Sequence, residues 1–167
     1  PKLHKTPVVG RPIVPSMATV LSDASRWVAS ELNLLLTKLQ PQVLKDTKSL
    51  VKCLESTTFP AACILSTADI SSLYTNIPNK DGIEALRQFL QSQDVPADRA
   101  TSLVGIMELI LENSFLEFEG TAYRQISGTA MGTPAAPPYA IIFLLMLEKR
   151  LVRHKPLLFS RYIDDLF

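Results

Sequence analysis

Cysteine is scarce in this sequence, which has only Cys53 and Cys63 among its 167 residues. The two lack the clustered spacing of a zinc site, and one pair is too few for a disulfide scaffold. We therefore expect two free, buried thiols in a reducing compartment.

Long apolar runs and an excess of either charge are also missing. The longest apolar run, residues 139–147, spans nine residues, whereas a transmembrane helix needs about 20. No signal peptide is recognisable. The formal net charge of +1 does not by itself indicate a nucleic-acid-binding protein, and an apolar content of 47% predicts a folded chain the size of one domain.

Basic residues are nevertheless clustered. Residues 1–22 hold three cations and no acid, and residues 149–161 hold five cations and no acid. The cations are Lys2, Lys5 and Arg11 in the first block and Lys149, Arg150, Arg153, Lys155 and Arg161 in the second. Each block could contact phosphates or could be an ordinary solvated surface.

The spacing of apolar residues predicts helices and strands in a mixed order. Helices are expected over residues 22–39, 46–55, 83–91, 96–112 and 139–153. Strands are expected over residues 61–65, a compact apolar run that predicts burial, over 115–118 and 122–126 as a hairpin, and over 159–167. Residues 79–82 should form a turn, and 128–138 a loop rich in glycine and proline. Because strands and helices do not alternate strictly, the predicted fold class is α+β.

Two adjacent aspartates, Asp164 and Asp165, interrupt the last apolar segment. Neighbouring like charges repel, and their burial is unfavourable unless a positive group compensates them. A divalent metal ion is the usual compensation, and oxygen ligands suit Mg²⁺. The alternative is an exposed turn containing both aspartates.

A third carboxylate and a pair of glycines fit the same chemistry. Asp69 follows the apolar run at 61–65, where a sheet would hold a ligand rigidly, although a helix cap or turn is the alternative. Gly128 and Gly132 would let the backbone approach a ligand closely, or form an ordinary connection. Asp69 with the Asp164–Asp165 pair supplies the carboxylates from separate strands that two-metal phosphoryl transfer needs.

These motifs occur with others in a recognisable order. The chain contains Lys-Leu-His-Lys at 2–5, Arg-Pro-Ile-Val at 11–14 and Asp-Ile-Ser-Ser-Leu-Tyr-Thr-Asn-Ile-Pro at 69–78. It continues with Tyr-Arg-Gln-Ile-Ser-Gly-Thr-Ala-Met-Gly-Thr-Pro at 123–134, Ala-Pro-Pro-Tyr-Ala at 136–140 and Arg-Tyr-Ile-Asp-Asp-Leu-Phe at 161–167. In these strings, over nearly its whole length, the chain resembles the reverse transcriptase domain of Penelope-like retroelements.

The resemblance implies a right-hand polymerase fold with an antiparallel palm sheet packed on helices. Residues 1–58 would be a fingers-like part, and residues 59–167 a palm that stops just after the Tyr-x-Asp-Asp motif. Thumb, primer grip and GIY-YIG endonuclease would then be absent, and the chain alone is not expected to extend a primer. A location inside the cell, in the nucleus, is implied in the same way.

The resemblance also implies a role for each matching residue. Asp69 and Asp164 would be the principal ligands of Mg²⁺ or Mn²⁺, with Asp165 beside them and the Ile70 carbonyl within reach. Tyr74 would exclude a 2′-hydroxyl on the incoming deoxynucleoside triphosphate. The remaining nucleotide-binding residues would be Arg11, Lys5 and Lys2 at the triphosphate and Gln125, Gly128 and Gly132 in the pocket. Many other reverse transcriptases carry Gln directly before the first glycine, where this chain has Ser127, which leaves open whether Gln125 or Ser127 contacts the nucleotide.

The function expected from the resemblance is RNA-directed DNA polymerisation on an RNA template and a DNA primer, without a membrane. One alternative is an inactive or domesticated remnant that acts as an RNA-binding module. Another is an unrelated metal-dependent phosphohydrolase, which would have no use for Tyr74 or the basic motifs at the start of the chain.

Overall fold

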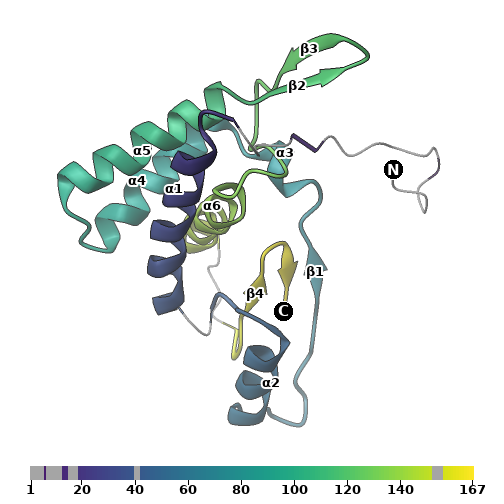
Figure 1. Cartoon of the computed structure of the whole chain (residues 1–167). Helices are drawn as coiled ribbons and strands as arrows, with labels where there is room; N and C mark the ends of the chain where they lie inside the picture. The colour runs from purple at the N-terminus through teal and green to yellow at the C-terminus, as the bar shows by residue number, and fades with distance from the viewer. Residues whose placement is uncertain (1–5, 7–12, 15–18, 40–41, 152–155) are drawn as a thin grey trace.

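Four helices form the main body of the protein. The computed structural model describes residue 6 and residues 13–14, 19–39, 42–151 and 156–167. The four helices are α1 (Ser22–Leu36), α4 (Asn79–Ser92), α5 (Ala97–Glu112) and α6 (Ala136–Leu151). Helix α6 packs against α1 and α4, and α5 packs against α1 and α4 (Figure 1).

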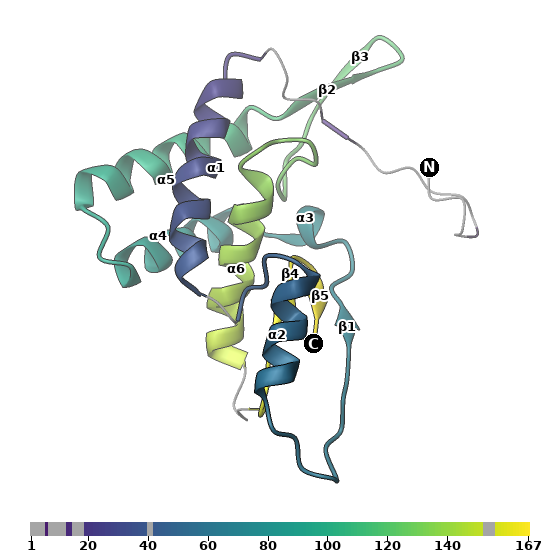
Figure 2. The same cartoon turned by 60° about the horizontal axis from the view of Figure 1, so that its bottom comes forward.

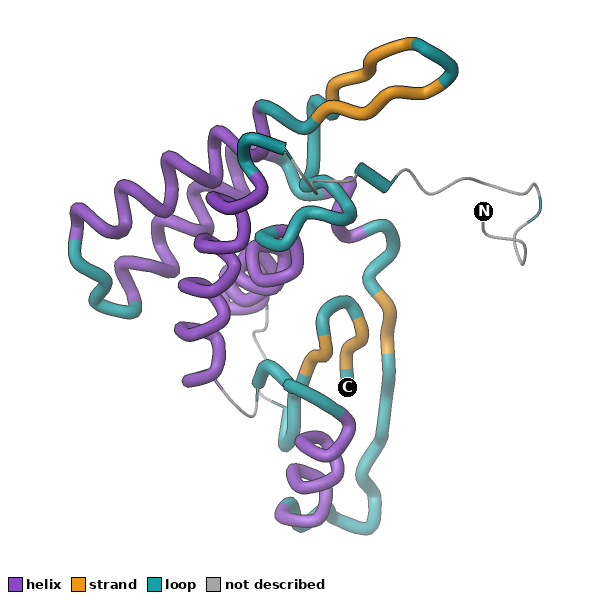
Figure 3. Tube along the Cα trace, viewed as in Figure 1, coloured by secondary structure: helices purple, strands orange, loops and turns teal. Residues whose placement is uncertain are grey.

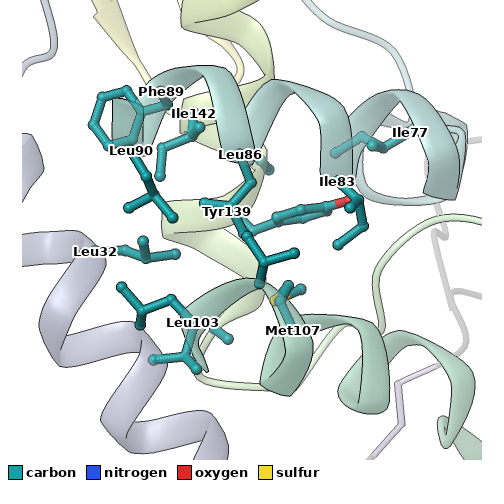
Figure 4. Packing of buried hydrophobic residues seen from close by; sticks show 14 of the residues in the cluster. Leu32, Ile77, Ile83, Leu86, Phe89, Leu90, Leu103, Met107, Tyr139 and Ile142 are labelled. Carbon is teal, nitrogen blue, oxygen red and sulfur yellow. The ribbon is translucent and has the colours of Figure 1, made fainter. Parts of the chain in front are cut away.

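The core between these helices follows from apolar residues spaced three and four apart. Tyr139 and Ile142 of α6 meet Leu86 of α4 and Met107 of α5 (Figure 4), and all four are at most 1% exposed. Burial of each such side chain stabilises the fold by roughly 1.5–3 kcal/mol. Residues 139–147 lie in a helix as predicted, and Tyr139 and Ile142 are buried, but Met146, also expected to be buried, is half-buried and Leu147 is 37% exposed.

Helix α6 begins earlier than its sequence suggested. It begins at Ala136, so that Pro137 and Pro138 lie in its first turn, where a missing amide proton breaks no intrahelical hydrogen bond. Residues 79–82, expected as a turn, are likewise the first turn of α4. The helices expected over 22–39, 46–55 and 96–112 are found as α1 with the 3₁₀ turn η1 (Thr37–Leu39), α2 (Thr47–Ser56) and α5.

A small antiparallel sheet lies outside the four-helix core, near α2 in Figure 2, and its residue Arg161 contacts α6. Its strand order is β1-β5-β4, with β1 at Ala68–Asp69, β4 at Arg161–Tyr162 and β5 at Asp165–Leu166. The segment 159–167, whose apolar pattern predicted a strand and whose family resemblance implied a hairpin, is a hairpin. A second hairpin, β2 (Phe115–Phe118) with β3 (Thr121–Arg124), projects from the opposite end (Figure 3), close to the boundaries expected from the sequence.

The buried strand expected over residues 61–65 is wrong. These residues form a loop, and Ile64 and Leu65 are 90% and 65% exposed. The strand begins only at Ala68, because Ala68 is the first residue of this segment with a strand partner, Leu166. Apolar character indicated burial, but backbone pairing decides where a strand forms.

Two further observations concern the cysteines and the length of the apolar helices. Cys53 and Cys63 are free thiols as predicted, but each is half-buried rather than buried. Across the described residues, no helix is both long and apolar enough to span a membrane.

Candidate functional site

The short sheet pairs Asp69 with Asp165, and Asp164 precedes Asp165 in the chain. In its register Asp69 of β1 stands directly opposite Asp165 of β5, and the Ile70 amide donates a hydrogen bond to the Asp164 carbonyl at 3.0 Å. Hydrogen-bonded and non-hydrogen-bonded pairs alternate along an antiparallel ladder, so Asp69 and Asp165 form a non-hydrogen-bonded pair. In such a pair the Cα atoms lie about 4.5 Å apart, and both side chains are on the same face.

Asp164 lies in the tight turn between β4 and β5. Tyr162 pairs with Asp165, which leaves Ile163 and Asp164 as a two-residue hairpin loop. Ile163 has a φ of +55°, a left-handed conformation that costs a β-branched residue roughly 1–2 kcal/mol. Asp164 therefore lies at the tip of the hairpin, directly after a residue with a strained backbone. Strained backbone conformations of this kind cluster at functional sites.

The carboxylates face open space. Asp69 and Asp165 are exposed, Asp164 is half-buried, and a pocket of about 430 Å³ borders the pair. The pocket is lined by Leu44, Leu50, Thr67, Ala68, Asp69, Tyr162, Asp165, Leu166 and Phe167. A substrate or ion can therefore reach Asp69 and Asp165 from solvent.

The donors at this site suit a hard divalent cation. Within the described part of the chain, no group of three or more His, Cys, Asp or Glu side chains converges to hold a metal ion. The paired Asp69 and Asp165 nevertheless offer two carboxylates side by side, and Mg²⁺ in nucleotide enzymes usually takes one or two carboxylates with water and phosphate oxygens. The oxygen-only set fits Mg²⁺ or Mn²⁺ better than zinc or copper.

Tyr74 is held in place by the glycine loop. It lies on the short helix α3 (Leu73–Asn76), is half-buried against the core, and its carbonyl accepts a hydrogen bond from the Thr129 amide at 2.7 Å. A Cβ added at Gly128 would stand 2.3 Å from that carbonyl oxygen, and Gly128 has a φ of +75°. Only glycine fits where these two backbones meet.

Gly132 makes a similar close approach to a different segment. Its added Cβ would lie 2.8 Å from the Val14 carbonyl, and the Val14 amide donates to the Met131 carbonyl at 2.8 Å. The sequence suggested that both glycines admit a ligand, whereas their nearest neighbours in the structure are protein backbone. Lys2, Lys5 and Arg11 lie outside the described residues.

Gln125 and Ser127 lie on the same side of this loop. Both line a groove with Thr75, Tyr123, Thr129 and Met131. The Gln125 side-chain amide donates to the Ser127 carbonyl at 2.9 Å. The two residues whose roles were left open are therefore neighbours in one groove beside α3.

Arg161 is the site residue that sequence reasoning missed. As a member of the basic block 149–161 it was expected to contact phosphate or solvent, but its side chain is fully buried. It forms an ion pair with Glu148 of α6 at 2.6 Å. The expectation is wrong for Arg161 because β4 turns this residue towards α6. A charged residue inside an apolar strand, the same signal used for the aspartates, could have marked Arg161 as a site residue.

Comparison with known proteins supports the fold. No protein-family model matches the chain, and no curated protein matches it. A solved structure of apo telomerase from Candida tropicalis, truncated from the C-terminal domain, superimposes with a TM-score of 0.60 at 13% sequence identity. The match covers 83% of this chain and 32% of the telomerase chain, so the protein described here spans about a third of that neighbour's length.

At this identity the likeness shows the fold alone. The chain is an α+β protein with a reverse-transcriptase-like polymerase fold, as the sequence predicted. The neighbour is a telomerase, a reverse-transcriptase-related polymerase, and the match does not extend to the Penelope-like branch.

Proposed function

We propose that this chain is the fingers and part of the palm of an RNA-directed DNA polymerase of a Penelope-like retroelement. Residues 1–58 would form the fingers-like part and residues 59–167 the palm. The observation that carries the proposal is the pairing of Asp69 on β1 with Asp165 on β5, next to Asp164 in the hairpin turn. Two segments almost a hundred residues apart thus place carboxylates on one sheet, inside a polymerase fold.

Each site residue has a task in this proposal. Asp69, Asp164 and Asp165, with the Ile70 carbonyl, would hold Mg²⁺ or Mn²⁺, which lowers the pKa of the attacking hydroxyl and stabilises charge on the phosphate oxygens. Tyr74 packs beneath the sugar of the deoxynucleoside triphosphate. The groove lined by Gln125 receives its base and the template, and Gly128 and Gly132 hold the neighbouring loop against the backbone. Lys2, Lys5 and Arg11 would bind the triphosphate.

The partners follow from this assignment. The substrates are an RNA template, a DNA primer and deoxynucleoside triphosphates, and the place of action is the nucleus. The side-chain carboxylates act by position and charge, so their geometry decides the rate more than their basicity does.

Mn²⁺ binding and primer extension test the proposal. Mn²⁺ binding to the 167-residue chain is followed by electron paramagnetic resonance, and extension of a DNA primer on RNA is measured with a protein that continues beyond Phe167. Asp69→Asn should lower extension on the order of a hundredfold or more, since metal-ion stabilisation is worth several kcal/mol. The matched control is Asp94→Asn, because Asp94 is exposed and its φ of +52° is one that Asn tolerates.

The outcomes separate polymerase from remnant. Extension that is lost in Asp69→Asn and kept in Asp94→Asn supports the proposal. RNA binding without extension in the longer protein, unchanged by Asp69→Asn, identifies an inactive RNA-binding remnant instead.

A further inference from the structure

Arg161 joins the hairpin turn to the helical core. Its fully buried guanidinium donates from three nitrogens: Nε to Glu148 Oε1 at 2.6 Å, Nη2 to the Ile141 carbonyl at 3.1 Å, and Nη1 to the Ile163 carbonyl at 2.9 Å. Glu148 and Ile141 belong to α6, whereas Ile163 is the first residue of the turn. One planar guanidinium group therefore bridges the core and the turn.

The side chain is not what holds its own strand in place. The Arg161 amide donates to the Gln42 carbonyl at 2.9 Å, and the Leu44 amide donates to the Arg161 carbonyl at 2.8 Å. Ser160 and Phe167 exchange two further backbone hydrogen bonds. We therefore expect strand β4 to keep its backbone pairing when the Arg161 side chain is changed.

The bond to the Ile163 carbonyl falls at the strained point of the hairpin. Ile163 is β-branched and adopts a φ of +55°, which persists only where the surroundings hold it. Its carbonyl belongs to the peptide that leads into Asp164, so a donor on that oxygen fixes the plane of this peptide. The Asp164 carbonyl in turn accepts from the Ile70 amide, which follows Asp69 in the chain.

We propose that Arg161 is a positioning residue that holds the Ile163–Asp164 turn and thereby sets the Asp164–Asp165 pair against Asp69. Through Glu148 it uses α6 as its fixed support. The effect on catalysis rests on the proposed polymerase function, whereas the effect on the turn rests on the geometry alone.

Hydrogen exchange at the Ile70 amide tests the effect on the turn. Arg161→Lys keeps the positive charge near Glu148 but lacks the planar fork, and it should speed exchange at Ile70 about tenfold, the effect of losing a charge-assisted hydrogen bond. The Gln125 amide, which donates to the Ser114 carbonyl, is the remote reference and should not change. Arg87→Lys is the matched control, since Arg87 forms an exposed ion pair with Glu108 at 2.7 Å.

A second variant separates positioning from stability. Arg161→Met/Glu148→Leu replaces a buried ion pair by apolar side chains, a change that often leaves stability unaltered or raised. Its melting temperature should stay at or above that of the wild type, while exchange at Ile70 still rises about tenfold. Mn²⁺ affinity of the chain should fall about tenfold in both Arg161 variants and stay constant in Arg87→Lys.

The results decide the proposal in each case. Wild-type exchange at Ile70 in a folded double variant overturns it, as does an increase shared equally by Gln125. Faster exchange and weaker Mn²⁺ binding support it, even where no primer extension is found, in which case only the polymerase function fails.

Discussion

The close approach of Gly128 to Tyr74 makes a graded prediction about stability. In Gly128→Ala the new methyl group would lie 2.3 Å from the Tyr74 carbonyl oxygen and 2.7 Å from the Thr75 Cα, in a residue with a φ of +75°. Both neighbours are backbone, so neither can rotate away. Ala in the left-handed region costs roughly 1–2 kcal/mol, and overpacking adds typically 1–3 kcal/mol, so the free energy of unfolding should fall by about 2–5 kcal/mol.

The chain supplies matched controls for each contribution. Gly120 has a φ of +73° and no atom within 4 Å of an added Cβ, so Gly120→Ala should lose only the conformational part, roughly 1–2 kcal/mol. Gly105 lies inside α5 with nothing within 4 Å, so Gly105→Ala should raise stability by about 0.5–1 kcal/mol.

Urea denaturation of the three variants measures the series. From the highest urea midpoint to the lowest, the order should be Gly105→Ala, wild type, Gly120→Ala and Gly128→Ala. The slope of the unfolding free energy against urea concentration should be similar in all four proteins. Equal losses in Gly120→Ala and Gly128→Ala would show that the loop does not pack on Tyr74, and the account of the groove beside α3 would fail.

Three further predictions concern single side chains. In an active protein, Tyr74→Ala should raise ribonucleotide relative to deoxyribonucleotide incorporation by on the order of tenfold or more; an unchanged ratio in a folded variant would assign Tyr74 to the core. The buried Tyr139 hydroxyl has no hydrogen-bond partner among the described residues, and burial raises its pKa well above the usual range. Tyr139→Phe should therefore raise the free energy of unfolding by about 1 kcal/mol. In the wild type, stability should fall above about pH 10, because Tyr139 ionises in the unfolded chain at a lower pH than in the folded protein, and Tyr139→Phe should remove this part of the fall. A lower free energy of unfolding in the variant would refute this account. The Ser49 hydroxyl and amide donate hydrogen bonds to the Asp46 carboxylate and lower its pKa. The cap therefore stabilises α2 above about pH 4, and this stabilisation is lost as the pH falls through the folded-state pKa of Asp46. Asp46→Asn should keep the cap without that acid dependence, and Asp46→Ala should lower the melting temperature. Equal melting curves of the wild type at neutral pH and in acid would contradict this account of the cap.

The sequence by itself determined the helices of the core and the identity of the candidate residues. Spacings of three and four in residues 83–90 and 103–111 can only be satisfied by helices that bury one side, and this information is local. The adjacent aspartates and the later glycines were visible for the same reason, since each breaks the pattern of its neighbours. The α+β class followed from the order of the predicted helices and strands, and the polymerase fold was implied by the resemblance to a reverse transcriptase family.

Only the tertiary structure decided how those residues meet. The apolar run at 61–65 lies outside the sheet because a strand needs a partner, and β5, which pairs with Ala68 and Asp69, comes almost a hundred residues later. Asp165, rather than Asp164, stands opposite Asp69 because the register between β1 and β5, two strands distant in the chain, fixes the pairing. Arg161 is buried against Glu148 because β4 turns it towards α6, and no local pattern records which face of a strand meets a distant helix.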